Sequence, residues 1–297
     1  MPRRSQLHPR AVDDITGNGA DTAHLGNTRN VPAPEPVGHL LRRWRLQRNL
    51  SQLDLAIRAD VSARHVSFVE TGRTLPSSAM VLRLAEHLTV PLRERNRLLV
   101  AAGHAPMFRQ RPPDDPDFEK IRAALRLILQ AHQPYPAAGL DHRWNVLLAN
   151  TAFDILLVEQ ADPDLLRPPV NLMRLAFHPK GLAPRVLNLG QVRAHLLPRL
   201  DRQATNTGDP QLHALYEELR SYGPDEQPQP PDPADIALPI RLDHHGVELC
   251  FINTVTTFGA AFDVTLEDIS IETYLPANDA TAQHCHQLGR SHTSAKT

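Results

Sequence analysis

The residues of this sequence with the clearest chemical potential are its arginines, because they concentrate in one segment. Residues 37–113 hold 13 arginines and five acidic residues, which gives a net charge of +8. Residues 1–36 carry no net charge and residues 114–297 carry −9, so the overall charge of −1 conceals the contrast. A basic module joined to an acidic one is typical of a chain in which one half meets nucleic acid. Ordinary charge scatter is the alternative, and so large a contrast over so short a segment disfavours it.

Other residue clusters give little support to catalysis or metal binding. The sequence contains no G-x-S-x-G, P-loop, G-x-G-x-x-G or H-E-x-x-H motif. His284, Cys285 and His286 are metal-ligand types, but three neighbours in a terminal segment rarely supply three well-placed ligands. His244 and His245 fall in an expected hairpin turn, where we expect them to be solvated. The sequence therefore predicts no metal, no cofactor and no identifiable enzyme chemistry.

Length and composition favour two globular domains and no membrane span. A chain of 297 residues corresponds to about two domains at ~150 residues each. The 41% hydrophobic fraction suffices for a core, and no apolar run approaches the ~18 residues of a membrane helix. Arg3 and Arg4 precede no apolar segment, so no signal peptide is expected. Two cysteines, Cys250 and Cys285, fit a reducing cytoplasm.

Proline-rich stretches and changes in periodicity divide the chain into five parts. Residues 1–36 lack periodicity and are expected to form a disordered arm, either solvated or touching phosphates through its arginines. Residues 37–111 form the basic helical domain, and residues 112–117 are a linker. Residues 118–280 form a second domain. Residues 281–297 are polar and are expected to be a flexible tail.

The pattern of the basic domain predicts a helix-turn-helix. Ser51 and Asp54 form a capping box before a short helix that ends near Arg58. Asp60 occupies a sharp turn, and Ser62 caps the next helix, over residues 63–70. Two short helices joined by a tight turn can place the second in the major groove of DNA. Further helices are expected at 37–49, from residue 77 and from residue 91; the first buries Leu40, Leu41, Trp44 and Leu46.

Residues 51–73, SQLDLAIRADVSARHVSFVETGR, resemble the helix-turn-helix of the XRE/Cro-repressor family. The resemblance rests on Gln52, Leu55, Ala56, Val61, Ser62, Glu70 and Gly72. Asp60 departs from the glycine usual in the family, and we expect the turn to survive it. The resemblance implies an all-α, five-helix, lambda-repressor-like domain that binds a double-stranded DNA operator as a homodimer. The alternative is a helical bundle used only for protein interaction.

The resemblance also implies roles for individual side chains. Base contacts fall to Ala63, Arg64, Ser67 and Phe68; phosphate contacts fall to Gln52, Ser62, Arg42, Arg43 and Arg73; Arg45 and Glu70 match a structural ion pair. Arg64 is the best candidate for base reading, because arginine pairs bidentately with guanine. Phe68 either touches a thymine methyl group or packs against a neighbouring helix. The phosphate-contacting arginines form, in the alternative interpretation, a solvated face.

Residues 118–280 show an α+β pattern. A helix at 118–132 turns Ile121, Ala124, Leu125 and Ile128 inward. Two strands follow within 137–150, where Asn150 caps the next helix. Helical stretches are expected near 152–158, 171–177, 190–204 and 210–221, and then a hairpin around 243–246 and a strand at 269–274. This order is similar to that of a PAS-like sensor domain.

Several segments resemble the MmyB-like bacterial regulators. They are residues 91–106, DHRWNVLLAN at 141–150, NLMRLAFHPKGL at 171–182 and the stretch at 254–279. The resemblance implies a one-component regulator whose second domain binds a small apolar, fatty-acid-like ligand. Candidate pocket residues are Trp144, Asn150, Phe153, Phe177, His178, Phe251, Thr254 and Phe258. Core packing, or helix capping for the polar ones, is the alternative for each. An antitoxin-like adaptor and a DNA-tethered enzyme remain alternative functions.

Overall fold

The computed structural model describes residues 35–111, 115–223, 237–259, 261 and 263–294. The expected N-terminal arm, up to residue 34, and residues 112–114 of the expected linker lie outside these ranges. The chain has a two-domain architecture, as predicted: a helical domain is followed by a domain with an antiparallel sheet and helices. Each domain is described by itself.

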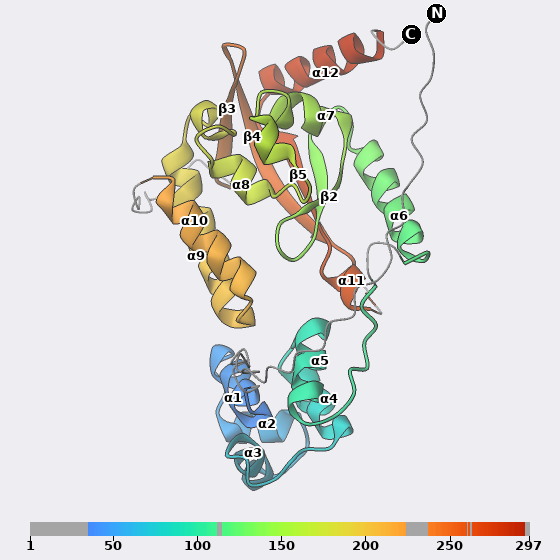
Figure 1. The fold of residues 1–297 in the computed structure, drawn as a ribbon, viewed down its shortest axis with the longest axis vertical. Helices are drawn as coiled ribbons and strands as arrows, with labels where there is room; N and C mark the ends of the chain where they lie inside the picture. Colours follow the sequence, from blue (N-terminus) through green and yellow to red (C-terminus); the bar gives the residue numbers. More distant parts are fainter. Residues whose placement is uncertain (1–34, 112–114, 224–236, 260, 262, 295–297) are drawn as a thin grey trace, which may run out of the picture. The chain divides into compact units, whose positions relative to one another are not determined.

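The first domain consists of five helices around an apolar core. They are α1 (Val37–Gln47), α2 (Gln52–Arg58), α3 (Ala63–Glu70), α4 (Ser78–His87) and α5 (Leu92–Ala101) (Figure 1). Leu40, Leu41 and Trp44 are buried in this core, as predicted. The prediction for Leu46 is wrong, because it lies near the end of α1 and is 53% exposed.

Local capping explains where α2 and α3 begin and end. The Ser51 hydroxyl accepts from the Asp54 backbone, and the Asp54 carboxylate accepts from the Ser51 N–H, so the predicted capping box is confirmed. Ser62 caps α3 by accepting from the backbone N–H of His65 at 3.1 Å. Asp60 holds φ at 51°, so the helix-turn-helix turn forms without the usual glycine.

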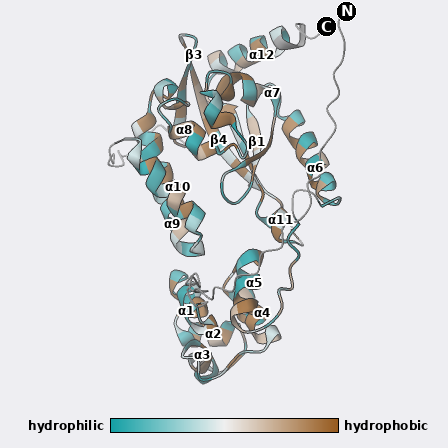
Figure 2. Cartoon of the chain, in the orientation of Figure 1, coloured by the Kyte–Doolittle hydropathy of each residue, from teal (hydrophilic) through white to brown (hydrophobic). Residues whose placement is uncertain are grey.

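Close contact between α1 and α3 requires a glycine at position 38. A Cβ atom there would collide with the carbonyl oxygens of Val69 and Glu70 at the end of α3. The backbone of α1 therefore approaches α3 more closely than any side chain would allow. Hydrophobic and hydrophilic residues alternate along these helices (Figure 2), as expected for helices that bury one face.

The second domain contains a five-stranded antiparallel sheet with strand order β2-β1-β5-β4-β3. The strands are β1 (Ala137–Leu140), β2 (Val146–Ala149), β3 (Pro239–His244), β4 (Val247–Thr257) and β5 (Ser270–Pro276). The helices are α6 (Phe118–Ala131), α7 (Thr151–Phe153), α8 (Leu172–Phe177), α9 (Leu189–Thr207), α10 (Pro210–Ser221), α11 (Val264–Glu267) and α12 (Asp279–Ser294). A π-helical turn, Asp154–Val158, continues α7. The predicted α+β class is confirmed.

Helices cover both faces of the sheet (Figure 1). Helix α6 packs Ile121, Leu125 and Leu129 against one face, next to Ile271 of β5. The prediction that Ile128 faces inward is wrong: it is 38% exposed, and Leu129, one position on, takes its place. Helices α8, α9 and α10 cover the other face, where Tyr274 of β5 belongs to the main core.

Helix α12 corrects the prediction that residues 281–297 form a flexible tail. Residues 279–294 are helical, and both Thr281 and Cys285 are buried. The Thr281 hydroxyl accepts from the Cys250 backbone N–H at 2.9 Å, which fixes α12 to β4. Cys285 and Leu288 of α12 join the main apolar core, with Thr281 buried one turn earlier, so tertiary contact rather than composition decides the structure of this segment.

The Cys285 thiol provides a direct test of this docking. Burial raises the pKa of Cys285 to about 11, so little reactive thiolate exists near neutral pH. In a Cys250→Ser variant, we expect Ellman's reagent to react with Cys285 at least ~100-fold more slowly in buffer than in denaturant. Similar rates in the two conditions would show that α12 does not stay docked.

Candidate nucleic-acid interface and internal cavity

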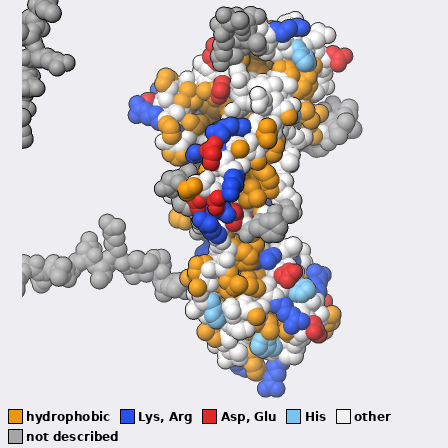
Figure 3. All heavy atoms as spheres, turned by 90° about the vertical axis from the view of Figure 1, so that its right-hand side faces the viewer, with side chains coloured by type: hydrophobic (Ala, Val, Ile, Leu, Met, Phe, Trp, Pro, Cys, Tyr) orange, Lys and Arg blue, Asp and Glu red, His pale blue; other side chains and the backbone are white. Residues whose placement is uncertain are grey.

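The predicted base-contacting residues lie together on α3. Val66 and Val69 of this helix are buried in the core, so Ala63, Arg64, Ser67 and Phe68 lie on its outer sides. The arrangement leaves Arg64 exposed, and the other three are partly buried. Arginine side chains (blue) lie at the surface of the helical domain in Figure 3.

Phe68 lies between two guanidinium groups. The Arg64 guanidinium carbon is 5.1 Å from the centre of the Phe68 ring, and the Arg73 guanidinium carbon is 5.6 Å from it. Such cation–π contacts hold long cationic side chains near one surface. The end of α3 therefore presents an aromatic ring flanked by two positive charges.

Two of the five predicted phosphate-contacting side chains are engaged within the protein. The Gln52 amide donates to Glu70 at 2.9 Å, and Arg43 pairs with Glu35 at 3.0 Å. Ser62 serves as the cap of α3, Arg42 is exposed on α1 and Arg73 lies beside Phe68. Arg42 and Arg73 therefore remain the cationic candidates with no acidic partner among the described residues.

Arg45 and Glu70 join the end of α1 to the end of α3. Arg45 Nε donates to Glu70 Oε1 at 2.6 Å, and Nη2 donates to Oε2 at 2.8 Å, in a bidentate pair. Arg45 Nη1 also donates to the Leu50 carbonyl at 2.7 Å. Both side chains are buried, so this pair fixes the position of α3 from inside the domain.

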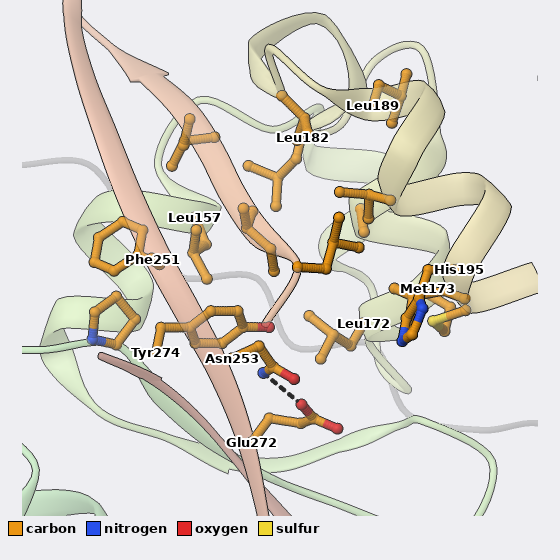
Figure 4. Close-up of a pocket in the computed structure, with 18 of the residues that line it drawn as sticks. Leu157, Leu172, Met173, Leu182, Leu189, His195, Phe251, Asn253, Glu272 and Tyr274 are labelled. Carbon is orange, nitrogen blue, oxygen red and sulfur yellow. Dashed lines mark hydrogen bonds between the residues drawn. The ribbon is translucent and has the colours of Figure 1, made fainter. Parts of the chain in front are cut away.

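The second domain contains a partly open cavity of about 300 Å³ between the sheet and helices α8 and α9. Its apolar wall includes Leu157, Leu172, Met173, Leu182, Leu189 and Phe251 (Figure 4). Volumes of ~300–1,000 Å³ with mostly apolar walls are typical of small-molecule sites. A few polar groups also line the cavity: His195, Arg199, Asn253, Glu272 and Tyr274.

The polar groups on the strands are more buried than those on α9. His195 and Arg199 are exposed, whereas Glu272 is 3% exposed and Tyr274 is 9% exposed. Burial raises the pKa of Glu272, and this effect outweighs the opposing hydrogen bond from Asn253 and the charge of Arg199. Burial also raises the pKa of Tyr274, so its hydroxyl stays neutral.

Of the eight predicted pocket residues, Trp144 and Phe251 line the cavity. The aromatic predictions Phe153 and Phe177 are core side chains, and Phe258 packs on the α6 side of the sheet. None of these three lines the cavity, because an aromatic residue in a sheet domain is as easily used for packing as for a pocket.

The polar pocket predictions also correspond to structural roles. Asn150 caps α7 and donates to the carbonyls of Leu129 and Tyr135. The Thr254 hydroxyl is 2.5 Å from that of Thr273. His178 packs edge-on against the Tyr222 ring, with centroids 4.9 Å apart. None of these three lines the cavity described above.

Sequence reasoning missed the buried polar end of the cavity. Glu272 and Tyr274 alternate with Ile271 along β5, and Ile271 faces α6. The available sequence signal was a glutamate two positions before a tyrosine within the predicted strand at 269–274. The sequence pattern alone could not distinguish this strand from one with a solvated face.

His244 is buried, so the prediction that this histidine is solvated is wrong. It is 3% exposed, and its Nδ1 lies 3.1 Å from Nε2 of His284 on α12. Burial, with additional effects from His245, His284 and Arg185, lowers the pKa of His244 to about 4, so the ring is neutral at pH 7. Among the described residues, no group of three His, Cys, Asp or Glu side chains is arranged to hold a metal ion.

Known protein families match both domains of the chain. A helix-turn-helix domain family matches residues 36–98. The family described as "MmyB-like transcription regulator ligand binding domain" matches residues 121–288, more than half of the chain. The chain belongs to the MmyB-like transcription regulators. This MmyB-like chain therefore combines a DNA-binding helix-turn-helix domain with a ligand-binding domain, and it is a DNA-binding transcription regulator.

Comparisons with individual proteins add little to this assignment. No curated protein matches the MmyB-like chain. Among solved structures, it is similar to "Structure of an RNA-binding Light-Oxygen-Voltage Receptor" at 15% identity and a TM-score of 0.26. That likeness covers 86% of this chain and 62% of the other chain, and it is too low to bear on fold or activity. No described helix is long and apolar enough to span a membrane.

Proposed function

We propose that this MmyB-like regulator binds a specific double-stranded operator as a homodimer and that a small apolar ligand in its second domain controls this binding. The observation that carries the proposal is the mostly apolar cavity of about 300 Å³ in a chain that also carries a helix-turn-helix. The proposal places the protein in the bacterial cytoplasm and gives it no catalytic activity.

The DNA-binding half of the proposal rests on charge and on the exposure of α3. The net charge of +8 in residues 37–113 provides a sequence-independent attraction to phosphate. Arg64 is exposed on α3, where a guanidinium can reach a guanine edge. A two-fold dimer would present two copies of α3 to half-sites about one helical turn apart.

The ligand-binding half rests on the cavity. Its wall is rich in leucine, which favours an aliphatic molecule. The resemblance to the family makes a fatty-acid-like compound the first candidate. Ligand would act by population shift, stabilising one arrangement of the dimer that fits, or fails to fit, both half-sites. Native mass spectrometry of the purified chain tests this half. A stoichiometric added mass that is lost on denaturation is expected, and turnover of that molecule would support a DNA-tethered enzyme instead.

Salt dependence tests the DNA-binding half. If Arg42 and Arg73 of both protomers neutralise four phosphates, we expect operator affinity to fall roughly 150-fold between 50 and 200 mM salt. Fluorescence anisotropy with a labelled operator, selected first from random DNA, measures this slope. A flat response would exclude the basic helical domain as the DNA surface.

The same selection tests the adaptor alternative. An interaction adaptor would enrich no sequence from random DNA, whereas a regulator would enrich a two-fold-related pair of half-sites. An Arg42→Gln Arg73→Gln variant should reduce the magnitude of the salt slope, since each phosphate contact contributes about 0.9 to it.

A further inference from the structure

The polar end of the cavity holds hydrogen-bond acceptors that the described residues leave without a donor. Asn253 Nδ2 donates to Glu272 Oε2 at 2.6 Å, which uses one of the two N–H donors of that amide (Figure 4). Within the described part of the chain, no other residue donates to the Glu272 carboxylate, and none donates to Asn253 Oδ1. Glu272 Oε1 and Asn253 Oδ1 are therefore acceptors without a donor among the described residues.

Glu272 is too buried for bulk water to supply the missing hydrogen bonds to its carboxylate. The side chain is 3% exposed and lines the cavity. A buried carboxylate with one hydrogen bond is costly unless a donor or a cation completes its environment. Among the described residues, no arginine, lysine or histidine forms an ion pair with Glu272.

Tyr274 adds a third group to this end of the cavity. It lies two residues after Glu272 on β5, so both side chains project from the same face of the sheet. In Figure 4 its ring lies beside Asn253 and Glu272, and its hydroxyl forms no hydrogen bond with any described residue. The hydroxyl can both donate and accept, so its oxygen is a further acceptor.

The cations near the cavity are at its exposed side. Arg199 lies on α9 with its guanidinium carbon 5.3 Å from the centre of the Trp144 ring, and the residue is exposed. His195, one turn earlier, is also exposed. The Arg199 charge acts on Glu272 but is outweighed by burial, and a ligand carboxylate bound to Arg199 or His195 would leave the acceptors of the strands without donors.

We propose that the cavity binds an amphipathic primary amine, whose ammonium group donates to Glu272, Asn253 and Tyr274 and whose alkyl chain lies among the leucines. An ammonium group carries three N–H donors and no acceptor, which suits a cavity end whose free acceptors include a buried carboxylate. This inference rests on the proposed function, because it names the ligand class for the same cavity. It replaces the fatty-acid-like ligand by one of opposite charge.

Three probes that share the same eight-carbon chain and differ in head group test which head-group charge the cavity prefers. Isothermal titration of the full-length chain with n-octylamine, 1-octanol and octanoate compares a cation, a neutral donor and an anion. We expect octylamine to bind about tenfold or more tightly than octanol, and octanoate to bind most weakly. Because this comparison uses the unmodified protein, it does not depend on the folding of any variant.

A matched pair of variants identifies the carboxylate. Glu272→Gln should weaken octylamine binding roughly 30-fold while changing octanol binding little, because the amide keeps the shape and loses the charge. Glu248→Gln is the control: Glu248 is exposed on β4 and pairs with Arg241 at 2.6 Å, away from the cavity lining, so all affinities should stay unchanged.

The outcomes separate the inference from the proposed function. Tightest binding by octanoate, or equal binding of octylamine and octanol, would overturn the amine assignment and leave the cavity as a ligand site. Unchanged octylamine affinity in Glu272→Gln would also overturn it. Binding of none of the three probes would overturn both the assignment and the cavity as the sensor site.

Discussion

Replacing Glu70 with alanine is expected to destabilise the helical domain by about 3–5 kcal/mol, because the change leaves the buried Arg45 guanidinium without its partner. The pair is bidentate, with N–O distances of 2.6 and 2.8 Å, and Gln52 would also lose its acceptor. Urea unfolding, followed by Trp44 fluorescence in a Trp144→Phe background, measures this loss. Trp44 is a suitable reporter because it is buried in the helical core.

The exposed pair between Arg83 and Asp60 provides the control. Its N–O distance is 3.2 Å and the Asp60 side chain is 95% exposed, so Asp60→Asn should change stability by less than about 1 kcal/mol. Asparagine also tolerates the positive φ at this position. The double variant Arg45→Met Glu70→Leu should regain much of the stability lost in Glu70→Ala, since it leaves no buried charge. A Glu70→Ala loss no larger than that of Asp60→Asn would refute the structural role.

Replacing Arg64 with alanine is expected to lower operator affinity roughly 5- to 150-fold and to lower affinity for random DNA much less. A bidentate arginine–guanine contact discriminates against the wrong base by ~1–3 kcal/mol, which corresponds to this range. The side chain is exposed on α3 and stays near Phe68, so its loss removes a contact without a core defect. Fluorescence anisotropy on operator and random duplexes of equal length gives both affinities.

Arg73→Ala is the matched control, since Arg73 also lies against Phe68 but follows the end of α3. If it contacts phosphate, its loss should weaken binding to both duplexes by a similar factor. An equal loss on both duplexes for Arg64→Ala would remove Arg64 from base reading.

The sequence by itself determined the helix-turn-helix, because local interactions decide its geometry. The capping hydrogen bonds join residues only three positions apart: Ser51 with Asp54 fixes the start of α2, and Ser62 with His65 fixes the start of α3. The turn at Asp60 and the left-handed Gly72 after α3 are likewise decided by the residue itself. The α+β order of the second domain also followed from short-range periodicity and turn signals.

Tertiary structure alone decided which residues meet in the second domain. The cavity groups from α9, β4 and β5 are separated by up to 85 positions along the chain, from Leu189 to Tyr274, and no periodicity indicates which face of a doubly covered strand adjoins a void. Thr281 and Cys285 are buried because β4 lies beside them, and His244 is buried because His284 lies on the docked α12. Burial of a polar residue depends on partners distant in the chain, so the same composition gives a free tail or a packed helix according to the surface beside it.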